Sequence, residues 1–312
     1  MKHIFIINPT AGKRNCTTEL MEMAKTLEER HNLEVECILT RNPGHATETA
    51  RAIAETGEDI RFYACGGDGT MNEVANGIAG FPNAAMTVIP VGTGNDFLKN
   101  FGGTAALFSQ AENLWNGPEF SLDAIDCNGR IAMTIACSGF DAQVAEDVHR
   151  FGKSPLLGGQ GSYIASIAVN FFARSLGHQW RITVDGEDLS GNYALAAVCN
   201  GRYYGGGFNP VAEARMDDGV LNTLLVKKVS RPQFLQFIGL YSKGEYYKVP
   251  NFTSCITAKE VVIESDDGRD IVTCLDGETI HNQRITLRMS DKKVRFFGPA
   301  GCDPNATYRP LP

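Results

Sequence analysis

Residues 60–80, IRFYACGGDGTMNEVANGIAG, contain a strand, a glycine-rich loop and a helix in immediate succession. The run over residues 60–65 is apolar enough for a buried strand. Gly66-Gly67-Asp68-Gly69-Thr70 follows it, and apolar residues then recur at helical spacing at Met71, Val74 and Ile78. A strand that leads through a glycine turn into a helix is typical of the repeating unit of a parallel sheet. The stretch therefore predicts an α/β fold.

The same order recurs on both sides of this stretch. Strand-like runs at residues 2–7, 34–39 and 87–91 alternate with helical patterns near residues 20–27 and 46–54. The first run ends at Asn8-Pro9-Thr10-Ala11-Gly12, and the last leads into Gly92-Thr93-Gly94-Asn95-Asp96. We therefore predict an N-terminal doubly wound parallel-sheet nucleotide domain over residues 1–125, which the C-terminal segment 292–312 would complete.

Beyond residue 125 the pattern changes to short alternating strands separated by Asp-Gly turns, as at Asp185-Gly186 and Asp276-Gly277. Helical patterns are few there, at residues 162–174 and 232–241, with Ser230 as a candidate cap for the second. This pattern predicts a C-terminal, mostly antiparallel β-sandwich-like domain over residues 126–291, so the chain has two domains.

The composition excludes several functional classes. The 312 residues include 43% hydrophobic residues, which is ordinary for a globular protein, and the net charge of −7 has no basic block, so we expect no nucleic-acid partner. We find no apolar run long enough to span a bilayer and no signal-peptide pattern. The nine cysteines lack metal-ligand or disulfide spacing. We therefore expect buried thiols in a reducing, cytoplasmic compartment.

The glycine loops indicate phosphate binding. Each loop follows a strand, and ligands of open α/β sheets bind at the carboxyl ends of the strands. Glycine lets the backbone approach phosphate oxygens, and the helix near Thr70 adds its positive dipole end. Asp68 would repel phosphate unless a divalent cation lies between them, which points to Mg²⁺. The structural alternative is an ordinary turn, with Thr70 and Glu73 as a helix capping box. Neither a Walker A loop nor a Gly-x-Gly-x-x-Gly fingerprint is present.

Together these segments resemble the diacylglycerol kinase catalytic-domain family, most closely its bacterial soluble lipid kinases. The resemblance implies nucleotide binding by the segment 8–12, by the signature loop 66–70 and by the segment 90–97. The nucleotide-site residues that it implies are Asn8, Pro9, Thr10, Ala11, Gly12, Thr40, Gly66, Gly67, Asp68, Gly69, Thr70, Asn72, Glu73, Gly92, Thr93, Gly94, Asn95 and Asp96. NAD kinases and phosphofructokinases carry similar Gly-Gly-Asp-Gly turns, so the order of all the segments carries the resemblance.

Two segments of the second domain also resemble segments of this family. Asp276-Gly277-Glu278 resembles the segment with the catalytic base, and either Asp276 or Glu278 is expected to take the proton of the acceptor. The segment 215–221 resembles one that holds a structural magnesium, with Asp218 and the backbone carbonyl oxygens of Arg215 and Val220 as ligands. A second Asp-Asp-Gly sequence lies at residues 266–268 and serves as an internal control. By spacing alone, both Asp-Asp-Gly sequences are ordinary turns.

The resemblance implies an ATP- and Mg²⁺-dependent lipid kinase that phosphorylates a hydroxyl of a lipid alcohol such as diacylglycerol, with its active site in a cleft between the domains. The alternatives are a kinase of a different lipid or small-molecule alcohol, or a catalytically silent lipid- or nucleotide-binding regulator. We expect peripheral contact with the inner membrane surface, through basic residues around residues 227–248 or through Arg150, Lys153 and Arg174. A homodimer is compatible with the sequence.

Overall fold

The computed structural model describes residues 1–92, 94–151 and 176–312, except for the side chains of residues 148–151. It divides into two compact units. Unit 1 is Met1–Ala124 with Ser290–Thr307, and unit 2 is Ile125–Met289 with Tyr308–Pro312. The expected helix over residues 162–174 lies outside the described residues.

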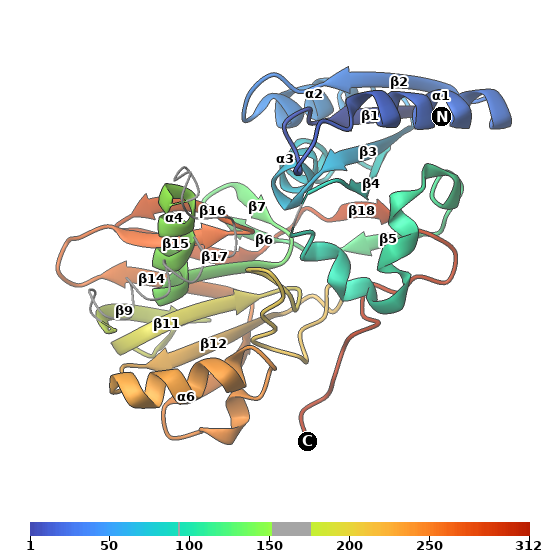
Figure 1. Cartoon of the computed structure of the whole chain (residues 1–312). Coiled ribbons are helices and arrows are strands. Elements are labelled where there is room, and N and C mark those ends of the chain that lie inside the picture. Colours follow the sequence, from blue (N-terminus) through green and yellow to red (C-terminus); the bar gives the residue numbers. More distant parts are fainter. Residues whose placement is uncertain (93, 152–175) are drawn as a thin grey trace. The chain divides into compact units, whose positions relative to one another are not determined.

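Unit 1 is built on a six-stranded sheet with the order β2-β1-β3-β4-β18-β5 (Figure 1). All neighbouring strands are parallel except β5, which runs antiparallel to β18. The strands are β1 (Lys2–Ile7), β2 (Glu34–Leu39), β3 (Ile60–Gly66), β4 (Ala84–Pro90), β5 (Glu119–Leu122) and β18 (Val294–Phe297). The last of these comes from the C-terminal end of the chain.

The helices of unit 1 are α1 (Thr17–His31), α2 (His45–Ala54), α3 (Asp68–Ile78) and the 3₁₀ segments η1 (Phe97–Ser109) and η2 (Ala111–Asn113). The chain moves outward from β1 to β2 and then crosses back to β3. Because parallel crossovers are right-handed, this reversal places α1 on one face of the sheet and α2 with α3 on the other. At Gly77 of α3 a Cβ would lie 2.8 Å from the Cβ of Ala50, so α2 and α3 pack closely. The predicted doubly wound parallel sheet is confirmed.

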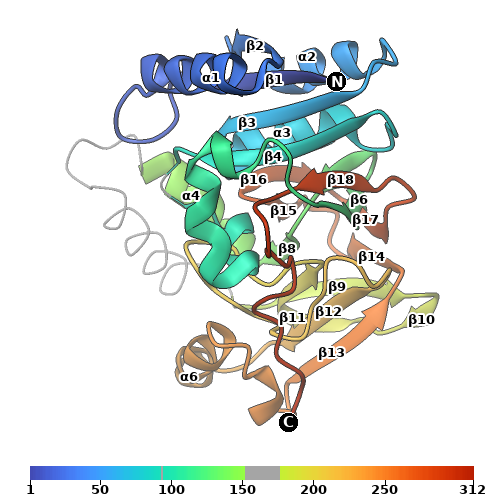
Figure 2. The same cartoon turned by 90° about the vertical axis from the view of Figure 1, so that its right-hand side faces the viewer.

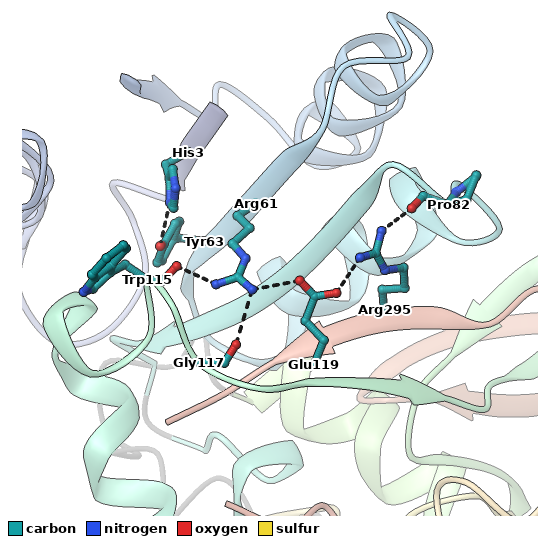
Figure 3. Close-up of polar contacts among 8 residues, drawn as sticks. All are labelled: His3, Arg61, Tyr63, Pro82, Trp115, Gly117, Glu119 and Arg295. Atoms are coloured by element: carbon teal, nitrogen blue, oxygen red, sulfur yellow. Dashed lines mark hydrogen bonds and ion pairs between the residues drawn. The ribbon is translucent and has the colours of Figure 1, made fainter. Parts of the chain in front are cut away.

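A charge network around the buried Arg61 fastens the C-terminal strand to this sheet (Figure 3). Arg61 of β3 donates to the carbonyl oxygen of Trp115 at 2.5 Å and pairs with Glu119 of β5 at 2.8 Å. Glu119 also pairs with Arg295 of β18 at 2.5 Å. The guanidinium of Arg61 lies 4.6 Å from the ring centre of Phe297. Burial alone would raise the pKa of Glu119, but the two arginines lower it. The network therefore links three strands that are far apart in the sequence.

Next to this network lies a histidine that should make unit 1 sensitive to acid. His3 is buried, its Nδ1 lies 2.9 Å from the hydroxyl of Tyr63, and burial together with the charge of Arg61 lowers its pKa to about 4 (Figure 3). The unfolded chain would take up this proton near pH 6.5, whereas the folded chain would not. The free energy of unfolding should therefore decrease as the pH falls from 6.5 towards 4, by up to about 3 kcal/mol.

The measurement is thermal unfolding across this range. We expect the melting temperature to fall from pH 6.5 to pH 4, and we expect the fall to be smaller in His3→Gln, whose side chain does not titrate. Equal slopes for the two proteins would show that His3 does not contribute.

Unit 2 is a twelve-stranded antiparallel sheet with the path β16-β15-β8-β11-β9-β14-β17-β6-β7. Strand β10 adds to β9, and β12 and β13 branch from β11 (Figure 2). The strands are β6 (Ile125–Cys127), β7 (Arg130–Ala132), β8 (Ile135–Gly139), β9 (His178–Val184), β10 (Glu187–Asp188), β11 (Gly191–Cys199), β12 (Leu221–Lys227), β13 (Thr253–Ala258), β14 (Glu260–Ser265), β15 (Ile271–Leu275), β16 (Glu278–Asn282) and β17 (Arg284–Met289). Its described helices are α4 (Phe140–Phe151), α6 (Arg231–Tyr241) and the 3₁₀ turn η3 (Tyr246–Lys248).

Both faces of the central strands of unit 2 are buried, because successive side chains enter two different cores. Leu195 and Ala197 of β11 belong to a cluster that also contains Phe140 of α4 and Phe234 of α6. The alternate residues Ala196 and Val198 of β11 belong to a second cluster, whose buried members all lie on strands. The predicted antiparallel, sandwich-like second domain is confirmed.

Candidate functional site

Four loops meet at the carboxyl edge of the sheet in unit 1. They follow β1, β2, β3 and β4. The loops after β1, β2 and β4 begin at Asn8, Thr40 and Val91, and β3 ends at Gly66, the first glycine of the signature loop. The strand order reverses direction between β1 and β3, so the loops after these two strands flank the switch point of the sheet. Ligands of such sheets bind at this position. The structure thus brings the predicted glycine loops together.

The loop after β1 lies across the end of β3. The amide of Asn8 donates to the hydroxyl of Thr70 at 3.1 Å, and its side-chain oxygen accepts the backbone N–H of Thr10 at 3.0 Å. At Gly12, φ is +79° and a Cβ would lie 2.4 Å from the carbonyl oxygen of Val91. Only glycine fits this approach to the β4 loop.

The signature loop packs directly on the loop after β4. The backbone N–H groups of Val91 and Gly92 donate to the carbonyl oxygen of Gly66 at 2.9 and 3.1 Å. A Cβ on Gly92 would lie 2.5 Å from the Cα of Gly67. Contact between the two loops therefore requires glycine at these positions. Thr93, which was also predicted for this site, lies outside the described residues.

Asp68 fastens the signature loop to the start of η1. Its carboxylate accepts the backbone N–H of Asp96 at 3.1 Å and that of Phe97 at 3.2 Å. Asp96 is itself paired with Lys99 at 2.5 Å. The sequence analysis missed Lys99, whose only signal was its position three residues after Asp96. Asp68 therefore positions the β4 loop, a role that the sequence did not suggest.

Glu73 does not form the capping box that its spacing from Thr70 suggested, because α3 begins at Asp68 and Thr70 lies inside the helix. Instead its carboxylate accepts the backbone N–H of Gly44 at 3.0 Å and of Ala46 at 3.1 Å, which caps α2. Asn72, one position earlier, is buried. The first turns of α3 thus hold the loops that follow β1, β2 and β4.

Several features of this edge of the sheet suit a phosphate ligand with a cation. The N-terminus of α3 carries the positive end of the helix dipole. Asn95 has φ +49°, and its side-chain oxygen is buried without a hydrogen-bond partner. The Asp68 carboxylate accepts the backbone N–H of Asp96, so these two acidic residues are neighbours, and Mg²⁺ is commonly held by one or two carboxylates with substrate phosphates. This donor set fits magnesium, although no three His, Cys, Asp or Glu side chains in the described ranges gather around a single point.

In unit 2 Asp276 occupies a tight turn. Asp276 and Gly277 both have positive φ, 47° and 99°, and they join β15 to β16 as a two-residue hairpin loop. The Asp276 carboxylate accepts the backbone N–H groups of Met133 at 2.5 Å and of Thr134 and Ile135 at 3.0 Å each. The turn places Asp276 outside the strand, so it does not share a strand face with Glu278.

Glu278 is partly exposed and has a different kind of partner from Asp276. It begins β16, its side chain is 44% exposed, and it forms an ion pair with Arg130 of β7. Arg130 was not a sequence candidate, because nothing local marks it. The Asp276 carboxylate thus holds the backbone of residues 133–135, whereas that of Glu278 pairs with an arginine side chain.

The segment predicted to hold a structural magnesium forms a small turn in unit 2. Asp218 accepts the backbone N–H of Val220 at 3.2 Å, and Arg215 pairs with Asp217 at 3.4 Å. The control segment behaves alike, since Asp267 accepts the backbone N–H of Arg269 at 3.1 Å. Local geometry therefore does not separate Asp218 from its control.

Two general expectations concern the rest of the chain. All nine cysteines are free thiols, and six of them are buried, as the sequence predicted. Among the helices of the described part of the chain, none is long and apolar enough to cross a membrane.

Comparison with known proteins agrees with this architecture. Residues 2–127 match the model of the diacylglycerol kinase catalytic domain, and residues 134–297 match that of the YegS C-terminal NAD kinase beta sandwich-like domain. A diacylglycerol kinase of Staphylococcus aureus (strain MRSA252) is 29% identical over 295 residues, which cover 94% of this chain and 91% of the relative. A protein named "Probable lipid kinase YegS-like" from Shewanella frigidimarina (strain NCIMB 400) is 26% identical over 304 residues, 93% of each chain.

The fold has also been seen in a solved structure. A protein from Bacillus anthracis str. Sterne, described as a candidate diacylglycerol kinase, superposes with a TM-score of 0.75. The superposition covers 95% of this chain and 96% of that one, at 24% sequence identity.

Proposed function

Because the chain belongs to the lipid kinase family that joins a diacylglycerol kinase catalytic domain to a YegS C-terminal domain, we propose that it transfers the γ-phosphoryl group of ATP to a hydroxyl of a lipid alcohol. Diacylglycerol is the first candidate acceptor. The observation that carries the proposal is the set of glycine loops at the carboxyl edge of unit 1, fastened to one another by Asn8, Asp68 and Glu73.

Unit 1 supplies the phosphate-binding chemistry. Backbone N–H groups of the glycine loops and the N-terminus of α3 would neutralise phosphate charge in fixed positions, and preorganised positioning is the main source of catalysis in phosphoryl transfer. Mg²⁺, when bound by Asp68 and Asp96, would screen the phosphate oxygens. Since the loops are already hydrogen-bonded to one another, binding ATP would require little ordering of the backbone.

Unit 2 supplies the carboxylates. We assign Glu278 as the group that takes the proton of the acceptor hydroxyl, because its side chain is partly exposed and paired with one arginine, whereas the Asp276 carboxylate accepts three backbone N–H groups. As the acceptor oxygen bonds to the γ-phosphorus, the bond from phosphorus to the bridging oxygen of ATP breaks and ADP leaves. The proton of the hydroxyl passes to Glu278.

The direct test is an assay with γ-labelled ATP and a panel of lipid alcohols. The panel holds diacylglycerol, monoacylglycerol, a sphingoid base and an isoprenoid alcohol, with glycerol as the soluble control. We expect label in one lipid product, dependent on Mg²⁺ and abolished by EDTA. Label in glycerol alone would replace the proposal with a small-molecule kinase, and no product with any acceptor would favour a silent binding protein.

The assignment of Asp218 to a structural magnesium site has a separate test. If Asp218 holds the ion, 5 mM MgCl₂ should raise the melting temperature above its value in EDTA. The rise should be about 3–5 °C if the Mg²⁺ concentration is roughly ten times the Kd of the site. The rise should vanish in Asp218→Ala and persist in Asp267→Ala, which removes the matching carboxylate of the control turn. A rise that survives in Asp218→Ala would place the ion elsewhere.

We further propose that the enzyme works as a peripheral protein at the cytoplasmic face of the inner membrane. Its proposed acceptor is embedded in a bilayer, so phosphoryl transfer requires contact with that surface. A homodimer is a further proposal, which sedimentation velocity would test.

A further inference from the structure

Helix α6 of unit 2 has no charged residue between Pro232 and Ser242. Its start is firmly fixed, because Ser230 and Gln233 form a reciprocal capping box and proline stands in the first turn. A helix on a protein surface ordinarily carries charged side chains on its outer face. The absence of any charge over this length therefore needs an explanation.

Not all apolar residues of α6 are buried against the core. Phe234, Phe237 and Tyr241 are fully buried in the core of unit 2. Leu235 is 58% exposed, whereas Ile238 is partly buried and packs against the same core. The exposed face of α6 thus carries a leucine among uncharged residues, Gln233, Gln236 and Gly239.

Basic residues stand at both ends of this apolar stretch, and all are exposed: Lys227, Lys228, Arg231, Lys243 and Lys248. The segment 227–248 contains one acidic residue, Glu245, which is paired with Lys248 at 2.9 Å. Five basic residues against one acidic residue give a net charge of +4, in a chain whose total is −7. Within the described residues, Lys227, Lys228 and Lys243 have no ion-pair partner.

We propose that α6 and its flanking lysines are the surface by which the protein docks on an anionic lipid bilayer, with Leu235 entering the interface and the lysines facing the headgroups. The proposal rests on the proposed function only in its choice of a lipid surface as the partner. Apolar residues flanked by lysines match the layers of a bilayer interface, with acyl chains beneath and phosphates above. A second copy of the same surface would place like charges against each other, which disfavours it.

The experiment is co-sedimentation with vesicles of phosphatidylcholine alone or mixed with equal phosphatidylglycerol, at 25 and 500 mM NaCl. The wild-type chain should bind the anionic vesicles at low salt, bind the neutral ones weakly, and be released at high salt. Replacing Lys227, Lys228 and Lys243 by glutamine should weaken binding at least tenfold, since each lysine near such a surface contributes roughly a factor of five. Leu235→Gln should weaken binding to the anionic vesicles several-fold at 25 mM NaCl.

Matched variants control for charge and for apolar area. Lys25, Lys259 and Lys292 are exposed elsewhere, and their replacement by glutamine changes the net charge equally. Leu107→Gln removes another exposed leucine, on η1. Both controls should bind vesicles as the wild type does. Binding that the α6 variants leave unchanged, or that the controls reduce equally, would overturn the proposal.

Two further measurements separate the outcomes. The α6 variants should phosphorylate a short-chain, monomeric lipid alcohol at the wild-type rate, because α6 contributes none of the proposed reaction groups. If no acceptor is phosphorylated while vesicle binding still depends on α6, the proposed function fails and the docking surface stands. If Leu235→Gln instead abolishes a concentration-dependent dimer in sedimentation velocity without changing vesicle binding, the surface is an interface between copies and the proposal is wrong.

Discussion

Asp68→Ala should reduce kcat/KM for ATP by at least about a hundredfold, which is the scale of losing a preorganised group at a charged transition state. Without the carboxylate, the backbone N–H groups of Asp96 and Phe97 lose their acceptor, and the β4 loop is no longer fastened to the signature loop. The proposed magnesium site also loses one of its two carboxylates. Steady-state kinetics on the purified, folded variant measure the effect.

Asp68→Asn separates these two contributions. Asparagine keeps one acceptor oxygen of the same size, so it can still hold one of the two N–H groups, but it carries no charge for a cation. If positioning dominates, Asp68→Asn should recover much of the activity that Asp68→Ala loses. If the metal dominates, both variants should be equally inactive, and extra Mg²⁺ should not rescue either. Near-wild-type activity of Asp68→Ala would show that the glycine loops are not the nucleotide site.

The glycine loops could be predicted because their signals are local. A buried strand followed by Gly66-Gly67 has few structural outcomes, and the order of four such strands is enough to predict a parallel sheet with its loops at one edge. The close contact between Gly92 and Gly67 adds a second reason for glycine at these positions, beside the approach of the backbone to phosphate. Composition and periodicity therefore predicted both the fold class and the place of the candidate site.

The hydrogen-bond partners of the acidic residues could not be predicted in the same way. Glu73 accepts N–H groups that lie 27 and 29 positions earlier, and Asp276 accepts N–H groups more than 140 positions away. A carboxylate that holds a distant backbone has the same sequence signature as one that awaits a ligand. The spacing from Thr70 to Glu73 also matched a capping box that the helix start at Asp68 excludes.

Whether a carboxylate holds the backbone or takes part in the reaction matters most at Asp276 and Glu278, where substitutions are expected to change activity strongly. Glu278→Gln keeps the size of the side chain and removes its basicity, so kcat should fall by about 10²–10⁴ if it takes the proton of the acceptor. ATP affinity and melting temperature should change little, because Glu278 is partly exposed and belongs to the acceptor side of the reaction.

Asp276→Asn should behave differently. Its new amide N–H group would face the backbone N–H groups of residues 133–135, where the carboxylate now accepts three hydrogen bonds. Leaving buried donors without an acceptor costs about 1–3 kcal/mol each, so the melting temperature should drop together with activity. Paired kinetic and thermal measurements on the two amide variants decide between the residues. If Asp276→Asn is as stable as the wild type but inactive while Glu278→Gln retains full turnover, the proton acceptor is Asp276, and exposure was the wrong guide to the base.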